Sequence, residues 1–273
     1  MKKKIIYFLS YILPKKFSNI AYEIIKNPPN KTLQLKSEEL KILKRAHQKD
    51  YIFNNYSIKT YKWIKNGEKI LFIHGWEGQT SNFSSIIKSL LKKNHSIYAF
   101  DAPSHGFSDR SKNTMADFNK FLLLFITKIN PDIIITHSFG AVPTTYSLTV
   151  NKKIIIKKLI LFAPPNKFSD RINDIINITG VCKKIKKYLI KKIENEYGRP
   201  FETLNISNFI NKINVDNILI LHDINDKICS VNYAKQIHRS LSNSKLEILE
   251  NTGHSKILRD DIAINKVINF IDS

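Results

Sequence analysis

The sequence predicts an α/β protein with a mostly parallel, eight-stranded β-sheet flanked by helices. Six short apolar runs alternate with helix-length segments, which is typical of βα units. Before them, residues 51–64 are rich in aromatic and β-branched residues, and the pair Asn66-Gly67 that follows is typical of a hairpin turn. This opening segment predicts two antiparallel strands at the start of the sheet.

Each apolar run has the length of a buried strand and is too short to be a helix of ordinary length. The runs are Ile70–Ile73, Ile97–Phe100, Ile133–Thr136, Leu159–Phe162, Ile218–Leu221 and Leu246–Leu249. Added to the opening pair, they predict the eight strands.

One interval between runs is too long for a single crossover helix. More than 50 residues separate Phe162 from Ile218, which predicts an inserted helical lid over about residues 165–213, after the sixth strand. Within it, residues 181–193 read as a basic amphipathic helix. Four apolar positions are expected to face the substrate pocket while the lysines face water: Ile175, Ile176, Ile185 and Leu189.

The length of 273 residues favours one domain, residues 51–273, preceded by a helical extension over residues 1–50. An amphipathic helix is expected from Ile5 to Ile25. Lys2 to Leu13 resembles a short signal peptide, but Pro14 follows and no small-residue cleavage site stands out. The interpretation is a cytoplasmic protein, with export or peripheral membrane association as the alternatives.

The net charge of +21 first suggests a nucleic-acid ligand. However, 38 of the 44 basic residues are lysines spread along the chain, whereas base and phosphate recognition relies on the planar arginine side chain. No specific nucleic-acid binding is expected. Weak contact with an anionic membrane through the basic N-terminus or the lid is the alternative use of this charge. Cys182 and Cys229 are too few for a disulfide framework and are not spaced like metal ligands, so no metal is expected.

The strongest chemical signal is an apolar strand that runs directly into Ser138, with Gly140 two residues later and Pro143 in the helix-compatible stretch that follows. A sharp strand-to-helix turn exposes a serine hydroxyl at the carboxyl end of a sheet, so small residues are needed where backbones meet. Ser138 is therefore the candidate nucleophile.

Two aspartates and a histidine follow the last apolar runs. A serine needs an imidazole to take its proton, and the imidazole needs a carboxylate to orient it. Asp226 follows the fifth of the six runs and His254 follows the sixth, so they are the candidate acid and base. Asp223, closer to its strand end, is the alternative acid.

These motifs resemble the α/β-hydrolase superfamily over about residues 50–273, with Thr136 in place of the first glycine of its nucleophile elbow. The order Ser138, Asp226, His254 is the order used by this fold. The resemblance implies oxyanion-hole N–H groups at Trp76 and Phe139, with His74 and Gly75 in the supporting loop. Asp101 and His105 lie in a segment that resembles a structural loop of the superfamily, with Ser104 replacing a glycine.

The resemblance implies hydrolysis of a small-molecule carboxylic ester or thioester through an acyl-enzyme, with no cofactor. Amide, peptide or carbon–carbon bond hydrolysis uses nearly the same triad and remains an alternative. A second alternative is a non-catalytic binding protein that has kept the fold.

Overall fold

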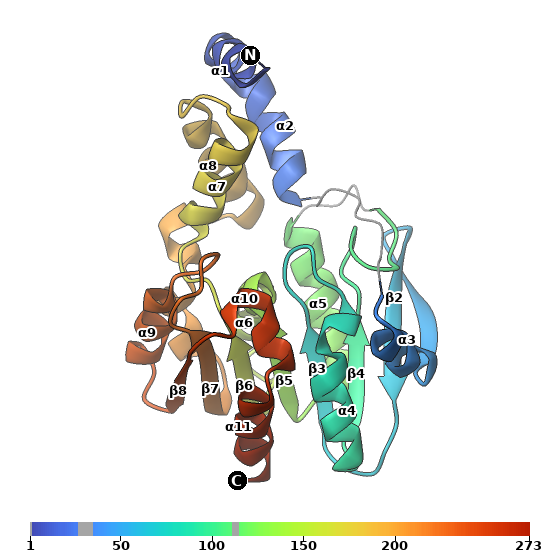
Figure 1. The fold of residues 1–273 in the computed structure, drawn as a ribbon. Helices are drawn as coiled ribbons and strands as arrows, with labels where there is room; N and C mark the ends of the chain where they lie inside the picture. The colour runs from blue at the N-terminus through green and yellow to red at the C-terminus, as the bar shows by residue number, and fades with distance from the viewer. Residues whose placement is uncertain (1, 27–34, 111–114) are drawn as a thin grey trace.

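The structure is a computed structural model that describes residues 2–26, 35–110 and 115–273. One eight-stranded sheet has the order β1-β2-β4-β3-β5-β6-β7-β8 (Figure 1). β2 is antiparallel to both β1 and β4, and all other neighbours are parallel. The strands are β1 (His47–Phe53), β2 (Tyr56–Trp63), β3 (Lys69–Ile73), β4 (Ser96–Phe100), β5 (Ile133–His137), β6 (Ile156–Phe162), β7 (Val215–Asp223) and β8 (Ser244–Leu249). The predicted fold class and all six predicted parallel strands are confirmed.

Helices pack on both faces of this sheet because its central strands are apolar on both sides. Ile70 and Phe72 contribute to one core cluster, whereas Leu71 and Ile73 contribute to the other. This alternation follows from the two-residue period of a strand. The helices are α1 (Lys2–Ile12), α2 (Pro14–Lys26), α3 (Ser37–Lys44), α4 (Ser84–Lys92), α5 (Met115–Ile129), α6 (Ala141–Val150), α7 (Phe168–Thr179), α8 (Ile185–Tyr197), α9 (Val231–Arg239), α10 (Gly253–Lys256) and α11 (Asp261–Asp272). Helices α3, α4 and α11 cover the first face, and α5, α6 and α9 cover the second.

The hairpin turn lies elsewhere than predicted. It is formed by Asn54 and Asn55, with φ of 46° and 65°, and not by Asn66-Gly67. Two consecutive positive φ values are the geometry of a type I′ hairpin turn, and asparagine tolerates them well. β1 consequently begins at His47, inside the segment expected to be a helical extension.

The predicted N-terminal helix is two helices, because Pro14 lacks the N–H that a helix interior requires and instead begins α2. Both lie beside α7 and α8, at the end of the molecule away from the start of the parallel strands (Figure 1). We call α1, α2, α7 and α8 the cap. No helix in the described part of the chain is long and apolar enough to cross a membrane.

The interior of the cap is formed by side chains of α2 and by side chains of α7 and α8, which lie far from α2 in the sequence. The four lid positions expected to face the pocket are buried against Ala21, Tyr22 and Ile25 of α2, so that expectation is wrong. An amphipathic pattern identifies a buried face but not its partner. Near the end of the predicted lid, Phe209 and Ile210 pack with α5 and α6 in the sheet core.

Candidate active site

Ser138 stands at a sharp turn between β5 and α6. Its φ of 49° is in the left-handed region, which is costly for a side chain other than glycine. A Cβ at Gly140 would lie 2.6 Å from the carbonyl oxygens of Ile73 and His74, so only glycine permits this approach to the end of β3. Thr136, the departure from the superfamily pattern, is fully buried within β5. The turn therefore holds the serine hydroxyl beside the loop that follows β3.

Three of the predicted site residues form one chain of hydrogen bonds. Ser138 Oγ lies 2.9 Å from His254 Nε2, and His254 Nδ1 lies 2.7 Å from Asp226 Oδ2. An ionised carboxylate only accepts, so Nδ1 carries the proton and Nε2 is left to accept from the serine hydroxyl. The arrangement can remove a proton from Ser138.

The carboxylate of Asp226 is completely buried and remains charged because of its hydrogen bonds. Burial by itself raises the pKa of Asp226, but the hydrogen bond with His254 and the N–H groups of Ile228 and Cys229 outweigh it and hold the pKa below its usual value. His222 Nε2 lies 3.5 Å from the same carboxylate and 2.8 Å from the Cys229 carbonyl oxygen. Asp226 is thus kept as an anion that orients His254.

Asp223, the alternative acid, contacts a different part of the site. Its Oδ2 accepts from the backbone N–H groups of Thr252 and Gly253 at 2.6 and 2.9 Å, and from the Thr252 hydroxyl. Burial raises the pKa of Asp223, but these hydrogen bonds prevail and lower it. Asp223 therefore holds the loop that presents His254 and does not bond the imidazole.

His137 fixes the other side of the same loop. Its Nε2 donates to the carbonyl oxygen of His254 at 2.8 Å, and the two rings have centroids 4.9 Å apart. Burial lowers the pKa of His137 to about 3, so the ring is neutral at pH 7. The last residue of β5 thus ties the base to the nucleophile's own strand.

The loop after β3 brings Trp76 next to Phe139, with ring centroids 6.4 Å apart. A Cβ at Gly75 would lie 2.9 Å from Ser138 Cβ, so glycine is required for this contact. Among the loop hydrogen bonds of the described residues, the Trp76 backbone N–H donates to no protein acceptor. His74 supports the loop, since its Nδ1 donates to the Gly75 carbonyl and its Nε2 accepts from the Ala102 N–H, both at 2.8 Å.

Asp101 and His105 serve the neighbouring loop, as the sequence suggested. Asp101 accepts from the Thr80 and Phe107 N–H groups and from the Tyr61 hydroxyl. Ser104, which replaces a glycine, has a φ of 65°, which explains the superfamily's preference for glycine there.

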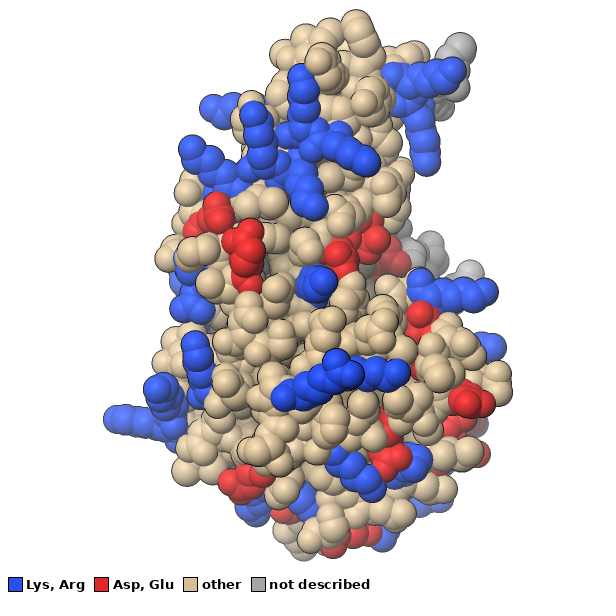
Figure 2. All heavy atoms as spheres, turned by 90° about the vertical axis from the view of Figure 1, so that its left-hand side faces the viewer, with Lys and Arg blue, Asp and Glu red and all other residues tan. Residues whose placement is uncertain are grey.

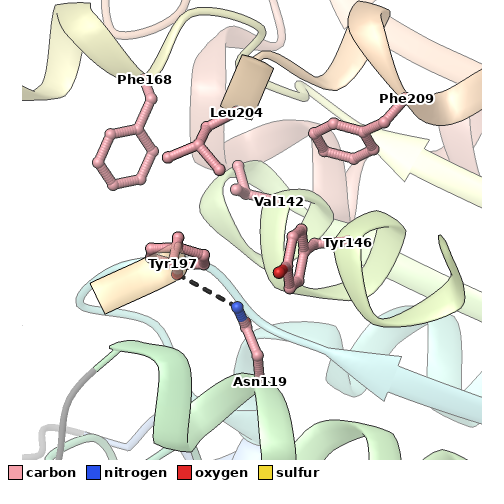
Figure 3. Close-up of a pocket in the computed structure, with 7 residues that line it drawn as sticks. All are labelled: Asn119, Val142, Tyr146, Phe168, Tyr197, Leu204 and Phe209. Atoms are coloured by element: carbon pink, nitrogen blue, oxygen red, sulfur yellow. Dashed lines mark hydrogen bonds between the residues drawn. The ribbon is translucent and has the colours of Figure 1, made fainter. Parts of the chain in front are cut away.

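The cap lies against both expected oxyanion residues. The Arg171 guanidinium is 4.7 Å from the centroid of the Trp76 ring, and Phe168 packs against Phe139 with centroids 6.3 Å apart. An apolar pocket opens beneath the cap, beside α6, which begins just after Ser138 (Figure 3). Its lining residues are Asn119, Val142, Tyr146, Phe168, Tyr197, Leu204 and Phe209.

His137 and Arg171 belong to this site although no sequence motif indicated them, and Asp223 was expected only as an alternative acid. The adjacency of His137 to the nucleophile was the one available signal, whereas nothing local connects Arg171 to Trp76. Within residues 2–26, 35–110 and 115–273, no cluster of His, Cys, Asp and Glu side chains is placed to hold a metal ion.

Comparison with known proteins relates this geometry to one superfamily. A family model described as "Alpha/beta hydrolase family" matches residues 70–181. "Putative esterase/lipase 2" of Mycoplasma genitalium is 34% identical over 132 residues, which are 46% of this chain and 47% of that protein. This match thus spans about half of that relative. "AB hydrolase superfamily protein YisY" of Bacillus subtilis is 23% identical over 75% of this chain and 91% of its own length.

Solved structures share the fold. The esterase EaEST from Exiguobacterium antarcticum superposes with a TM-score of 0.64 at 18% identity, covering 80% of this chain and 96% of its own. This coverage of the chain is greater than that of the family model, which matches residues 70–181.

Proposed function

The chain belongs to the α/β-hydrolase superfamily, and from this premise we propose that it is a serine hydrolase that cleaves a carboxylic ester or thioester through an acyl-enzyme. The single observation that carries the proposal is the continuous hydrogen-bond chain from Ser138 through His254 to Asp226. Relatives named as esterase/lipase support the same reaction class.

In the acylation half-reaction, Ser138 Oγ attacks the substrate carbonyl carbon while His254 Nε2 takes the hydroxyl proton. The carbonyl oxygen becomes negative in the tetrahedral intermediate and accepts hydrogen bonds from the Trp76 and Phe139 N–H groups. When the C–O or C–S bond breaks, His254 gives its proton to the departing alcohol or thiol. The acyl group is left on Ser138.

In deacylation, a water molecule attacks the ester carbonyl as His254 takes one of its protons. Collapse of the second tetrahedral intermediate releases the carboxylic acid and returns a proton to Ser138. Asp226 stabilises the imidazolium in both halves and is not itself protonated. Removing Ser138 or His254 therefore costs nearly as much as removing all three residues, whereas removing the Asp226 charge costs less.

The acyl group is assigned to the pocket beneath the cap. Val142 and Tyr146 line it from α6, the helix that follows Ser138, and Phe168 and Leu204 close it from the cap side. The lining is mainly apolar, which suits a hydrocarbon or aromatic acyl group. The cap is therefore the determinant of acyl preference, whereas the triad is indifferent to it.

The test is hydrolysis of p-nitrophenyl esters and acyl thioesters of graded chain length, with labelling by a fluorophosphonate probe. Ser138→Ala should abolish labelling and lower kcat by about 10⁴-fold or more, and His254→Ala should be nearly as damaging. Ser89→Ala, a half-buried serine of α4 remote from the site, is the matched control and should keep both. Unlabelled wild-type protein with a native circular dichroism spectrum would favour a binding protein instead.

A further inference from the structure

Helix α1 presents an unusual amount of apolar surface to solvent. Of the 20 large hydrophobic side chains exposed in the described residues, seven fall within nine consecutive positions of this helix and its C-terminal end, each 42–63% exposed. They are Ile5, Tyr7, Phe8, Leu9, Tyr11, Ile12 and Leu13. A helix with apolar residues around most of its circumference is normally buried, so this surface needs a partner.

The helix is nevertheless attached to the cap along one narrow strip. Ser10 is fully buried and its Oγ accepts from the Cys182 N–H at 2.7 Å, while the Lys3 stem packs by Gly180. Lys184 Nζ lies 3.5 Å from the centroid of the Tyr11 ring. These contacts fix one side of α1 on the turn between α7 and α8. In α2, by contrast, Ala21, Tyr22 and Ile25 are buried in the cap and Ile20 is exposed, so the exposed apolar surface lies mainly on α1 and its C-terminal end.

The surroundings of this surface are strongly cationic. Helix α1 carries no acidic residue, and lysines of α8 and of the turn before it are exposed nearby, among them Lys183, Lys187 and Lys191. Figure 2 shows basic side chains gathered on the upper part of this face, below a tip with little charge. The arrangement is an apolar tip with a basic collar.

We propose that α1 docks this protein on an anionic lipid bilayer, with its apolar side chains in the acyl-chain boundary and the collar lysines among the headgroups. A bilayer with anionic headgroups is apolar inside and negative at its surface, which matches the tip and the collar in that order. Tyr7 and Tyr11 also have the apolar ring and polar end that suit this interface. A second copy is a poor match, because pairing two tips would bring two basic collars together. The proposal is independent of the hydrolytic activity.

The test is cosedimentation of the full chain with phosphatidylcholine vesicles, with and without phosphatidylglycerol. The wild type should bind the anionic vesicles at least about tenfold more tightly, and salt should weaken this binding. The double variant Phe8→Glu/Ile12→Glu should bind about tenfold or more weakly. Its matched control is Ile155→Glu/Ile262→Glu, which makes the same charge change at side chains 59% and 61% exposed, far from α1. The control should stay within about twofold of wild type.

A second pair separates charge from apolar insertion. Lys183→Gln/Lys187→Gln should reduce the preference for anionic vesicles, whereas Lys152→Gln/Lys153→Gln, exposed in the α6–β6 connection, should not. Thermal unfolding checks that all variants are folded. Equal vesicle binding by wild type and Phe8→Glu/Ile12→Glu overturns the proposal. So does a wild-type dimer that this variant dissociates, without vesicle binding, because the apolar face is then covered by a second copy.

Discussion

The carboxyl edge of the sheet and the cap are held together by different forces. At the sheet edge, Asp223, His137 and His74 bond backbone groups of neighbouring loops, so each reacting side chain has a position set by directed hydrogen bonds. In the cap, α2 packs on α7 and α8 through apolar side chains. Apolar contact is not directional. The difference indicates that chemistry belongs to the rigid edge, whereas the cap can vary without moving the triad.

The largest expected effect is the loss of activity caused by a change at the carboxyl edge of the sheet. Asp226→Asn should lower kcat for an activated ester by about 10³-fold or more, because an amide no longer fixes the His254 tautomer or stabilises the imidazolium. The control is Asp216→Asn, which changes an exposed aspartate of β7, the strand that precedes Asp226. If Asp226→Asn keeps the wild-type kcat, Asp226 is not the carboxylate of the triad, and the site at the sheet edge has no assigned acid.

A substitution in the cap interior should instead destabilise the cap and leave the active site unaffected. Leu189 is fully buried between α8 and α2, so Leu189→Ala should destabilise the cap by about 2–5 kcal/mol. Hydrogen exchange should accelerate in α2 and α8, while kcat for a short acyl ester changes little. If kcat for the short ester falls together with the hydrogen-exchange protection of α2 and α8, the cap and the sheet edge are coupled. The cap then cannot vary without affecting the triad.

The pH dependence of stability reports on the buried histidines of the edge. Burial lowers the pKa of His74 to about 4 and of His105 to about 3, and burial likewise lowers that of His137 to about 3. A histidine in the unfolded chain has a pKa near 6.5. The contribution of these neutral histidines to the free energy of unfolding is therefore complete above about pH 6.5 and is lost as the pH falls toward about 4. Each such histidine contributes at most about 1.4 kcal/mol per pH unit.

His105→Phe should make this slope shallower by up to that amount, because one proton fewer is taken up on unfolding. Urea unfolding followed by fluorescence from pH 8 to pH 4 measures it. An unchanged slope would mean that His105 is already protonated in the folded protein.

The smallest expected effect concerns specificity. Phe168 belongs to the cap, lines the pocket and contacts Phe139. Phe168→Ala enlarges the pocket and should shift the preferred acyl length, changing the ratio of kcat/KM between short and long esters by about tenfold. The fluorophosphonate labelling rate of Ser138 should be nearly unchanged. The same chain-length preference in both proteins would place acyl selection outside the pocket.

Local pattern was enough to predict the strands and the candidate reacting residues. A buried parallel strand needs only a short apolar run, and the polar residue that ends the run lies at the carboxyl edge wherever the strand pairs. Ser138 was placed in this way, whereas Asp226 and His254 were placed by their positions after the last two runs and by the residue order of the superfamily's triad. The hairpin was misplaced because Asn-Gly and Asn-Asn both tolerate positive φ, and only strand pairing distinguishes them.

Only the tertiary structure decided which element packs on each apolar face and which groups each carboxylate binds. The sequence established that α8 has an apolar face, but the contact of that face with α2 joins segments more than 150 residues apart. The choice between Asp223 and Asp226 likewise depended on which carboxylate meets His254 and which meets the N–H groups of Thr252 and Gly253. Periodicity and turn chemistry are properties of neighbouring residues along the chain, whereas the partner of a face or a carboxylate is set by how distant elements pack.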